Sequence, residues 1–278
     1  MNYDLTKVHE AGLKILTEID RICRKYRIQY MLDAGTLLGA VRHQGFIPWD
    51  DDVDIAFTRK NYEAFLKVVR RELPEGMEFL DCRDFQGGKA FFDFTSRVIY
   101  KNSRMHEDTP MMQYYEGKLN HLWVDLFVLD ELPANKVSAA WTVLLHKIIY
   151  GLSMGHRYEL DFGKYSPFHK LAVGLLAGVG RFIPMKVMFK MQDFVAKKDG
   201  KGKSNLYYYS NYQPDYLYVT LQKEWCENVV DIDFEGRKLM APSGYHEVLV
   251  WVYGDYQKLP PEEKRVPSHS SMEIQIFD

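Results

Sequence analysis

Residues 33–57 read DAGTLLGAVRHQGFIPWDDDVDIAF, and this stretch decides what fold to expect. Its last five residues, VDIAF at 53–57, alternate in polarity and predict a strand. LLGAVRH at 37–43 predicts a short helix, which follows a turn at Gly35 and Thr36 and precedes the loop GFIPWDD. The acidic residues therefore gather where a buried strand begins.

Asp52 and Asp54 are two residues apart on this predicted strand, so their side chains should share a face. Two such charges about 6 Å apart repel by roughly 3 kcal/mol at an effective dielectric constant near 20. Hard divalent cations bind carboxylate oxygens and offset such repulsion. We predict that both residues bind a cation, although a solvated acidic loop would explain Asp50 and Asp51 equally well.

A third carboxylate would complete a metal site, and Asp125 is the best candidate. It lies within the apolar strand LWVDLFV, where an unpaired charge is costly. Asp93 in FFDFT is the alternative, and Asp130 is expected to end the same strand as Asp125. We expect Asp125 either to bind the cation or to be hydrogen-bonded within the structure.

Gly35 and Thr36 precede the predicted helix in a pattern that suits phosphate binding. A glycine lets the backbone approach a ligand closely, and the start of a helix offers free N–H groups. Arg42 and His43 follow on the same helix, and each is a candidate for contacting an anion. The alternative is an ordinary turn followed by two solvated basic residues.

The remaining pattern predicts an α+β protein with a small mixed sheet flanked by helices. We expect a helix over 5–27, a strand over 28–33, a helix from Thr58 to Leu73, and strands over 90–100 and 121–130. Helices should follow to about residue 198, then an exposed linker at 197–203 and an irregular, aromatic tail. This order suggests a catalytic core over 1–133, with 134–278 completing the substrate site.

Composition narrows the class of protein. The 278 residues carry a net charge of −2, which gives no global signal for nucleic-acid binding. Three widely spaced cysteines argue against a disulfide framework or a cysteine zinc site and fit a reducing compartment. The first residues lack the pattern of a secretory signal, so we expect a cytoplasmic protein.

Two apolar stretches, 137–155 and 171–189, come nearest to a membrane span. Both are interrupted, the first by His146 and Lys147 and the second by Arg181, Pro184 and Lys186. One interpretation is a pair of core helices. The other is a surface that rests on a membrane from one side.

The long motif GTLLGAVRHQGFIPWDDDVDIAF closely resembles the signature of the LicD family of phosphotransferases, whose distant relatives include fukutin. VDLFVLDELP and YGDYQKLPPEEKRVPSH are similar to the second and third motifs of that family, and the resemblance extends over nearly the whole chain. Two departures stand out. Leu126, Phe127 and Val128 replace the usual Ile-Phe-Pro, and His269 stands alone where paired histidines are usual, which leaves roles for His269 and Arg265 open.

The resemblance implies a nucleotidyltransferase-like fold, with Gly35 and Thr36 at a phosphate-binding turn. It implies Asp52 and Asp54 as metal ligands, Asp125 as the third carboxylate, and Mg²⁺, or alternatively Mn²⁺, as the cation. The implied reaction moves phosphocholine from CDP-choline to a hydroxyl of a lipid-linked precursor of teichoic acid, lipopolysaccharide or capsule, and it releases CMP. Such an enzyme would work at the inner face of the plasma membrane.

Other functions are compatible with parts of this pattern. The donor would be CDP-glycerol or CDP-ribitol in a second version of the same enzyme. A metal-dependent phosphodiesterase would use water as the acceptor, and a scaffold would only bind the cation. The aromatic stretch YYYSNYQPDYLY at 207–218 is a candidate cage for the quaternary ammonium of choline, or simply packs the second half of the chain.

Overall fold

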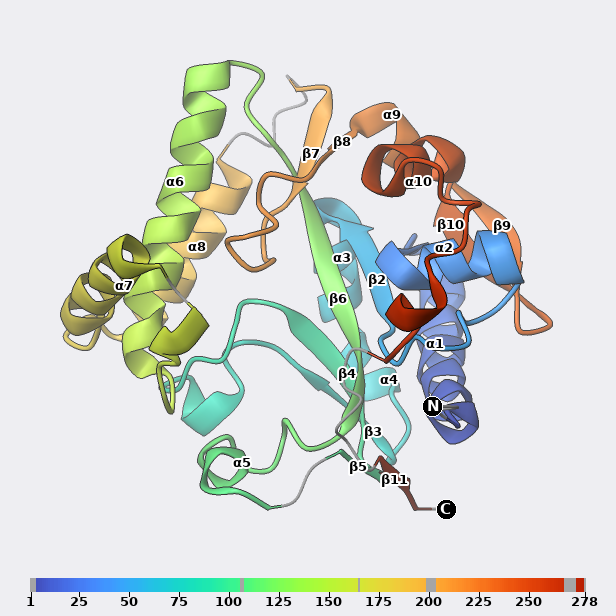
Figure 1. Cartoon of the computed structure of the whole chain (residues 1–278), viewed down its shortest axis with the longest axis horizontal. Coiled ribbons are helices and arrows are strands. Elements are labelled where there is room, and N and C mark those ends of the chain that lie inside the picture. Colours follow the sequence, from blue (N-terminus) through green and yellow to red (C-terminus); the bar gives the residue numbers. More distant parts are fainter. Residues whose placement is uncertain (1–3, 106–107, 165, 199–203, 268–273, 278) are drawn as a thin grey trace.

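A computed structural model describes residues 4–105, 108–164, 166–198, 204–267 and 274–277. The protein is built on a seven-stranded mixed sheet, ordered β1-β2-β6-β4-β3, with β7 paired to β6 and β8 paired to β7 (Figure 1). Its strands are β1 (Met31–Leu32), β2 (Asp54–Thr58), β3 (Met77–Leu80), β4 (Ser96–Tyr100), β6 (Leu122–Glu131), β7 (Leu206–Tyr209) and β8 (Thr220–Gln222). The remaining strands form two separate pairs, β9 (Val229–Phe234) with β10 (Arg237–Pro242) and β5 (Ser103–Arg104) with β11 (Gln275–Ile276).

Strand β6 is the long central member of the sheet. It runs parallel to β2 on one side, and on the other side its first half pairs with β4 and its last residues pair with β7, both antiparallel. Its apolar side chains are buried along most of its length, as the sequence LWVDLFV suggests. Residues from both predicted halves of the chain thus join one sheet, while the division at residue 133 stays a prediction.

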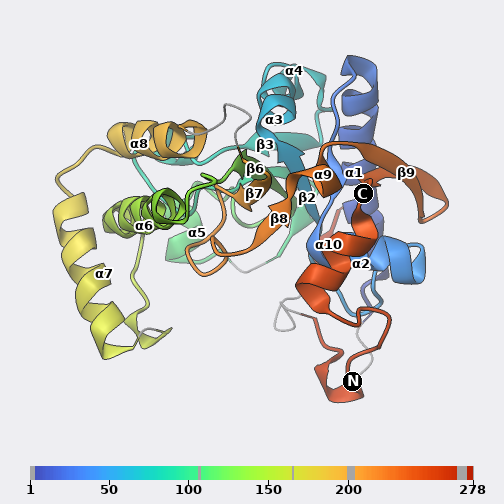
Figure 2. The same ribbon diagram turned by 90° about the horizontal axis from the view of Figure 1, so that it is seen from above.

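Helices surround this sheet in two groups. Helix α1 lies against β4 and β6, α3 against β2 and β6, and α8 against β6, while α6, α7 and α8 pack together on the side away from α1 and α10 (Figures 1 and 2). The helices are α1 (Thr6–Tyr26), α2 (Ala34–His43), α3 (Arg59–Leu66), α4 (Val69–Glu72), α5 (Pro110–Tyr114), α6 (Lys136–Ser153), α7 (Pro167–Gly180), α8 (Met185–Lys197), α9 (Lys223–Cys226) and α10 (Tyr245–Tyr253). Short 3₁₀ turns are η1 (Phe85–Gly87), η2 (Met154–His156), η3 (Phe162–Lys164) and η4 (Glu262–Lys264).

The predicted α+β class is confirmed, with several corrections to the elements. The expected helix from Thr58 to Leu73 is broken into α3 and α4. The expected strand at 90–100 begins only at Ser96, because Phe91 and Phe94 instead pack against α6 and α8 in a second apolar cluster. Strands β3, β7, β8, β9 and β10 were not predicted, and part of the expected linker, 199–203, lies outside the described residues.

Helix α2 begins earlier than predicted. It starts at Ala34, so Gly35 and Thr36 lie in its first turn rather than in a turn that precedes it. The reason is that Asp33 has the extended backbone of an N-cap residue, and its carbonyl accepts the N–H of Leu37 at 2.9 Å. The predicted turn is therefore the start of the helix itself.

Candidate active site

Three charged side chains stand in one row across the middle of the sheet. Asp54 on β2 lies beside Asp125 on β6, and Asp125 lies beside Arg97 on β4. Residues paired across neighbouring strands place their side chains on the same face. Strand register thus brings together the two aspartates that the sequence singled out, together with an arginine that it did not.

The start of β2 is fixed to the start of α2. The backbone N–H of Asp54 donates to Oγ1 of buried Thr36 at 2.9 Å, and the N–H of Asp33 donates to the carbonyl of Asp54 at 3.1 Å. Thr36 thus holds the backbone from which the Asp54 carboxylate projects. Phosphate binding by the Thr36 hydroxyl stays a prediction, because that oxygen already accepts a hydrogen bond from Asp54.

Gly35 faces the carboxylate of Asp50. A side-chain carbon at this position would overlap Oδ2 of Asp50, so only glycine lets that carboxylate lie against the first turn of α2. The close approach that the sequence suggested for a ligand is occupied here by a side chain of the protein. A role of Gly35 toward phosphate remains a prediction.

Asp125 forms part of a buried ion-pair cluster. Nε of Arg97 donates to Oδ1 of Asp125 at 2.7 Å, Nη2 of Arg97 donates to Asp93 at 2.7 Å, and the Trp123 indole donates to Oδ2 of Asp125 at 3.0 Å. The guanidinium also lies over the rings of Phe92 and Trp123. Asp93, the alternative third carboxylate, is therefore the second partner of this arginine.

One side of the site is formed by Asp54 and the carboxylates near it, and the other by Asp125 and Arg97. We call them the acidic wall and the Arg97 wall, and they differ in their electrostatics. Burial, together with the charges of Asp125 and Asp52, raises the pKa of Asp54 well above its usual value. Burial raises the pKa of Asp125 as well, but Arg97 opposes this rise. For Arg97, burial lowers the pKa, and Asp125 and Asp93 more than compensate, so the guanidinium stays charged.

Two further carboxylates join the acidic wall. Burial, followed by the charge of Asp52, raises the pKa of Asp50 to about 7. Burial raises the pKa of Asp33 to about 6, although its carboxylate accepts the Tyr209 hydroxyl at 2.8 Å. Within the described residues, the Asp54 carboxylate has neither a hydrogen-bond donor nor an ion-pair partner. Beyond burial, the charge of Asp52 thus raises the pKa of both Asp50 and Asp54.

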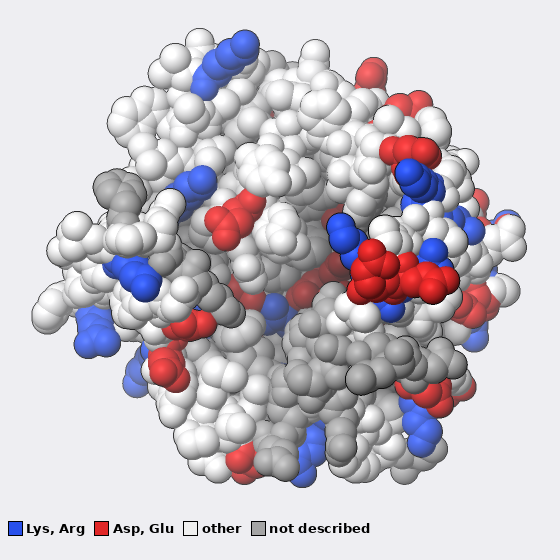
Figure 3. All heavy atoms as spheres, viewed as in Figure 1, with Lys and Arg blue, Asp and Glu red and all other residues white. Residues whose placement is uncertain are grey.

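Asp52, Asp54 and Asp125 line one pocket of about 370 Å³. Figure 3 shows this part of the surface as a hollow with acidic atoms on its floor and basic side chains close by. The rest of its lining is largely apolar and aromatic, including Phe92, Trp123, Phe127 and Tyr212. The pocket therefore joins a charged floor to an aromatic wall.

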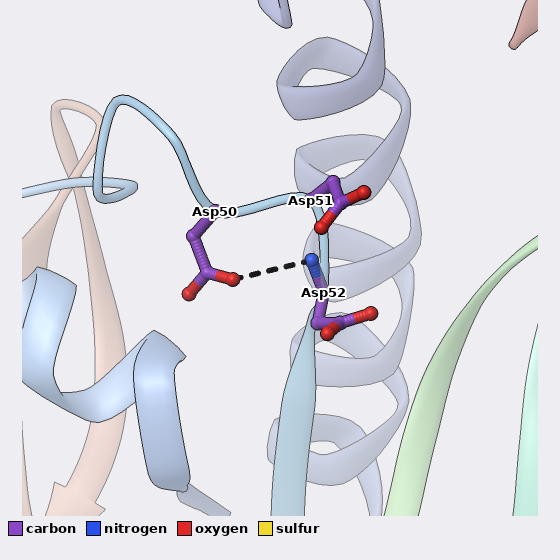
Figure 4. Close-up of side chains that lie close together, drawn as sticks. All are labelled: Asp50, Asp51 and Asp52. Carbon is purple, nitrogen blue, oxygen red and sulfur yellow. Dashed lines mark hydrogen bonds between the residues drawn. The ribbon is translucent and has the colours of Figure 1, made fainter. Parts of the chain in front are cut away.

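The acidic floor fits a divalent cation in its chemistry. In the described part of the chain, the carboxylates that lie within 4.8 Å of one another belong to Asp50, Asp51 and Asp52, and not to the predicted set Asp52, Asp54 and Asp125. In Figure 4 the Asp50 side chain turns toward the N–H of Asp52, 3.5 Å away, while the Asp52 side chain points away from Asp50. Oxygen donors alone, with no nitrogen or sulfur ligand, are the set that Mg²⁺ and Mn²⁺ accept.

Arg42 and His43 lie at the other end of α2, away from the pocket of the aspartates. Nη1 of Arg42 donates to the carbonyl of Tyr256 at 2.9 Å, and burial, aided by nearby Arg265, lowers its pKa. His43 packs edge-on against Trp49, and burial and Arg42 lower the His43 pKa. Neither side chain lines the pocket, so their contact with an anion remains a prediction, as does any role of Arg265.

Sequence reasoning missed four polar residues that shape the site, namely Asp33, Asp50 as a half-buried carboxylate, Arg97 and Tyr209. Arg97 had a visible signal, because a charge within the apolar run SRVIY needs a buried partner. Asp33 and Tyr209 had none, since they are 176 residues apart. His269 lies outside the described residues.

Comparison with known proteins gives a match to a family model and matches to named relatives. Residues 27–147 match the family model described as "LicD/FKTN/FKRP, nucleotidyltransferase domain". Over 268 residues the chain is 30% identical to the lipopolysaccharide cholinephosphotransferase LicD of Haemophilus influenzae, which covers 92% of each chain. Over 120 residues it is 32% identical to the ribitol 5-phosphate transferase FKRP of Homo sapiens and of Mus musculus, which covers 43% of this chain and 20% of FKRP.

Proposed function

Since the chain belongs to the LicD family of phosphotransferases, we propose that it moves phosphocholine from CDP-choline to a hydroxyl of a cell-surface glycan precursor and releases CMP. The acceptor we expect is a precursor of teichoic acid, lipopolysaccharide or capsule. The observation that carries the proposal is the pocket in which Asp52, Asp54 and Asp125 meet an aromatic wall. A metal held by the carboxylates would bind the donor phosphate, and the aromatic wall would contact the quaternary ammonium of choline. The donor therefore needs both surfaces side by side.

The acidic floor would hold the metal. Asp52 and Asp54 are the ligands we assign, and Asp50 and Asp51 offer further oxygens within 4.8 Å of an oxygen of Asp52. A bound Mg²⁺ would neutralise charge on the donor phosphates and favour in-line displacement. Thr36 contributes by fixing the backbone of Asp54, so the carboxylate is aimed before the substrate arrives.

Asp125 is the residue we assign to the acceptor hydroxyl. As the hydroxyl oxygen forms its bond to phosphorus, Asp125 accepts the proton and the bond to CMP breaks. Its raised pKa brings the carboxylate closer to the range in which a base works at neutral pH. Arg97 and Trp123 each hold one carboxylate oxygen, which fixes the direction of the remaining lone pairs.

Tyr212 is the residue we assign to the choline group. Its ring lies 4.4 Å from Phe127 and stacks on Tyr216 at 4.4 Å, at the edge of the pocket. The other predicted cage tyrosines have different positions: Tyr207, Tyr208 and Tyr209 are buried in the core. Only the second part of YYYSNYQPDYLY is therefore available for a cation–π contact.

Replacing Tyr212 tests this assignment. We expect Tyr212→Leu to raise the KM for CDP-choline about tenfold, because a desolvated cation–π contact is worth on the order of 1–2 kcal/mol. The KM for CDP-ribitol should change less, since ribitol carries no cation. Tyr218→Leu, at an exposed tyrosine of the same loop, is the control and should leave both constants unchanged. Equal losses for both donors would contradict a choline site here.

A direct assay tests the function as a whole. The protein is incubated with CDP-choline, CDP-glycerol or CDP-ribitol and Mg²⁺, with and without a glycan acceptor, and CMP release is measured. We expect release only when CDP-choline and the acceptor are both present. Release without acceptor would instead indicate a phosphodiesterase, and no release with any donor would leave only a cation-binding scaffold.

CDP-ribitol is the second donor to consider. The observation in its favour is the 32% identity to a ribitol 5-phosphate transferase over 120 residues. The match to the cholinephosphotransferase extends over far more of the chain, which is why choline is placed first. A KM for CDP-ribitol well below that for CDP-choline would reverse this order.

A further inference from the structure

Helix α7 exposes a continuous apolar stripe. Leu171, Leu175, Val179 and Phe182 follow one another at spacings of three or four residues, and they are 63%, 63%, 57% and 89% exposed. From Leu171 to Gly180 the helix has no charged residue. Figures 1 and 2 both place α7 at the outer edge of the molecule. The sequence left two interpretations of 171–189, a core helix and a surface that rests on a membrane. A core helix does not explain the exposed stripe of α7.

The stripe ends at a sharp elbow. The helix axes of His169–Gly180 and Met185–Lys197 differ by 118°, and Phe182 lies in the short link between them. Helix α8 continues the pattern with exposed Val187, Met191 and Phe194. By length and hydropathy, the segment Lys136–His156 would suffice to cross a membrane, although 39% of its apolar window is buried against protein, and the bent pair would count as a second such segment.

The elbow between α7 and α8 is held in place by close packing against α6. A side-chain carbon on Gly180 would overlap the carbonyl oxygen of Leu152, so α7 packs on α6 at backbone distance. On its inner side Ala177 is buried in the cluster formed with α6 and α8. The outer stripe is thus held in one orientation by close packing beneath it.

Charge around the stripe indicates what covers it. Residues 166–198 contain six lysines and arginines and one aspartate, although the whole chain is slightly acidic. Arg181, Lys186 and Lys190 are exposed and form no ion pair with the described residues. Protein interfaces are depleted in lysine, whereas an aliphatic stripe with a lysine and arginine rim suits an anionic bilayer.

A single histidine joins the elbow to the wall of the pocket. Nε2 of His156 donates to the carbonyls of Gly180 and Ile183, each at 3.0 Å. The His156 carbonyl accepts the N–H of Phe91 at 3.0 Å and the hydroxyl of Tyr114 at 3.2 Å. Phe91 precedes Phe92, which lines the pocket. The elbow is therefore linked by hydrogen bonds through His156 to the segment 91–92, which forms one side of the pocket.

We propose that the α7–α8 elbow docks on the surface of an anionic lipid bilayer, with Phe182 and the α7 stripe inserted among the headgroups and Arg181, Lys186 and Lys190 contacting lipid phosphates. Docking would hold the pocket next to the membrane, where an amphiphilic acceptor resides. It is a property of this surface and does not depend on which donor the enzyme uses.

Vesicle flotation tests the proposal. The full chain is mixed with vesicles of phosphatidylcholine alone or with about 30% phosphatidylglycerol, at low salt and at about 0.5 M salt. We expect flotation with the anionic vesicles and loss of flotation at high salt. Failure of the wild-type protein to float with either vesicle would overturn the proposal.

Two pairs of variants locate the surface. Phe182→Asp should abolish flotation, while the control Trp251→Asp, at a 61% exposed tryptophan on α10, should not. Arg181→Gln with Lys186→Gln should weaken partitioning about fivefold for each charge removed, at ~1 kcal/mol per basic residue. Exposed Arg237 and Lys258, both changed to Gln, provide the charge control. Equal effects of elbow and control variants would overturn the location.

Two further measurements separate this proposal from its rivals. If light scattering shows a dimer that Phe182→Asp converts to a monomer, the stripe is covered by a second copy and the bilayer proposal is wrong. CMP release with a water-soluble acceptor should be unchanged in Phe182→Asp. A wild-type protein that floats but releases no CMP would overturn the proposed reaction and leave the docking surface standing.

Discussion

The acidic wall and the Arg97 wall of the pocket each hold a carboxylate with a raised pKa, and they differ in the charges around it. Asp54 and Asp125 are direct neighbours on adjacent strands, and burial raises the pKa of each. Asp125 has its own cation, Arg97, and an indole donor, whereas Asp54 is surrounded by further carboxylates. Asp125 therefore has a cation supplied by the protein, although Nη1 of Arg97 is buried without a hydrogen-bond partner among the described residues, while Asp54 has no such cation among them.

This difference suggests which wall binds the metal and which holds a fixed group. A buried carboxylate paired with arginine keeps its orientation whether or not a ligand is present. Crowded carboxylates repel one another in the free protein, and a divalent cation would relieve that repulsion. In our proposal, a cation bound by Asp52 and Asp54 would relieve this repulsion.

Asp54→Asn should have the largest effect on activity. We expect transfer to fall by on the order of a thousandfold, because one charge that aligns the donor phosphates is lost. The metal-free variant should melt at the same temperature as the wild type or higher, since a repulsive charge has been removed. CMP release and thermal melting with EDTA measure the two effects.

Two other outcomes would contradict the role assigned to Asp54. A large drop in melting temperature of the metal-free Asp54→Asn protein would show that the carboxylate is structural. Activity within a few fold of the wild type would mean that the cation is held elsewhere, with Asp50, Asp51 and Asp52 as the next set to test.

Arg97→Met should chiefly affect stability. It keeps the volume of the side chain but leaves Asp93 and Asp125 as unpaired buried charges, a change that costs about 3–5 kcal/mol. Denaturant unfolding measures the loss. Adding Asp93→Asn and Asp125→Asn to Arg97→Met should recover much of the stability without restoring activity. No recovery in the triple variant would show that Arg97 stabilises the fold through its packing on Phe92 and Trp123 instead.

The sequence predicted one wall of this site better than the other. The two-residue spacing singled out Asp52 and Asp54, but β2 begins only at Asp54 and Asp52 lies just before it, so the alternation of a strand applies to Asp54 alone. The cluster of Arg97 with Asp93 and Asp125 depends on the register between β4 and β6, and no local pattern encodes that register. The bond between Tyr209 and Asp33 requires β7 to join the far end of β6.

The start of α2 and the stripe of α7 show the same limit. Gly35 and Thr36 were predicted as a turn because glycine usually interrupts a helix, but the N-cap at Asp33 and the neighbouring Asp50 decide the outcome. The helical spacing of Leu171, Leu175 and Val179 can be seen in the sequence. Whether another element covers that face depends on tertiary packing, which the spacing does not reveal.

The pH dependence of stability should show the smallest effect, and it separates the two walls most directly. The pKa of Asp50 is raised to about 7 and that of Asp33 to about 6, both above the value of an unfolded aspartate. The native state therefore binds more protons than the unfolded state between about pH 4 and pH 7, so stability falls as pH rises through this window. We expect the metal-free protein to lose about 2 kcal/mol between pH 6 and pH 8, and Mg²⁺ at pH 8 to restore it. Asp50→Asn should flatten the slope, while Asp215→Asn, at an exposed aspartate, should not. A metal-free protein that is more stable at pH 8 than at pH 6 would mean that the acidic wall is not strained, and the contrast with the Arg97 wall would no longer hold.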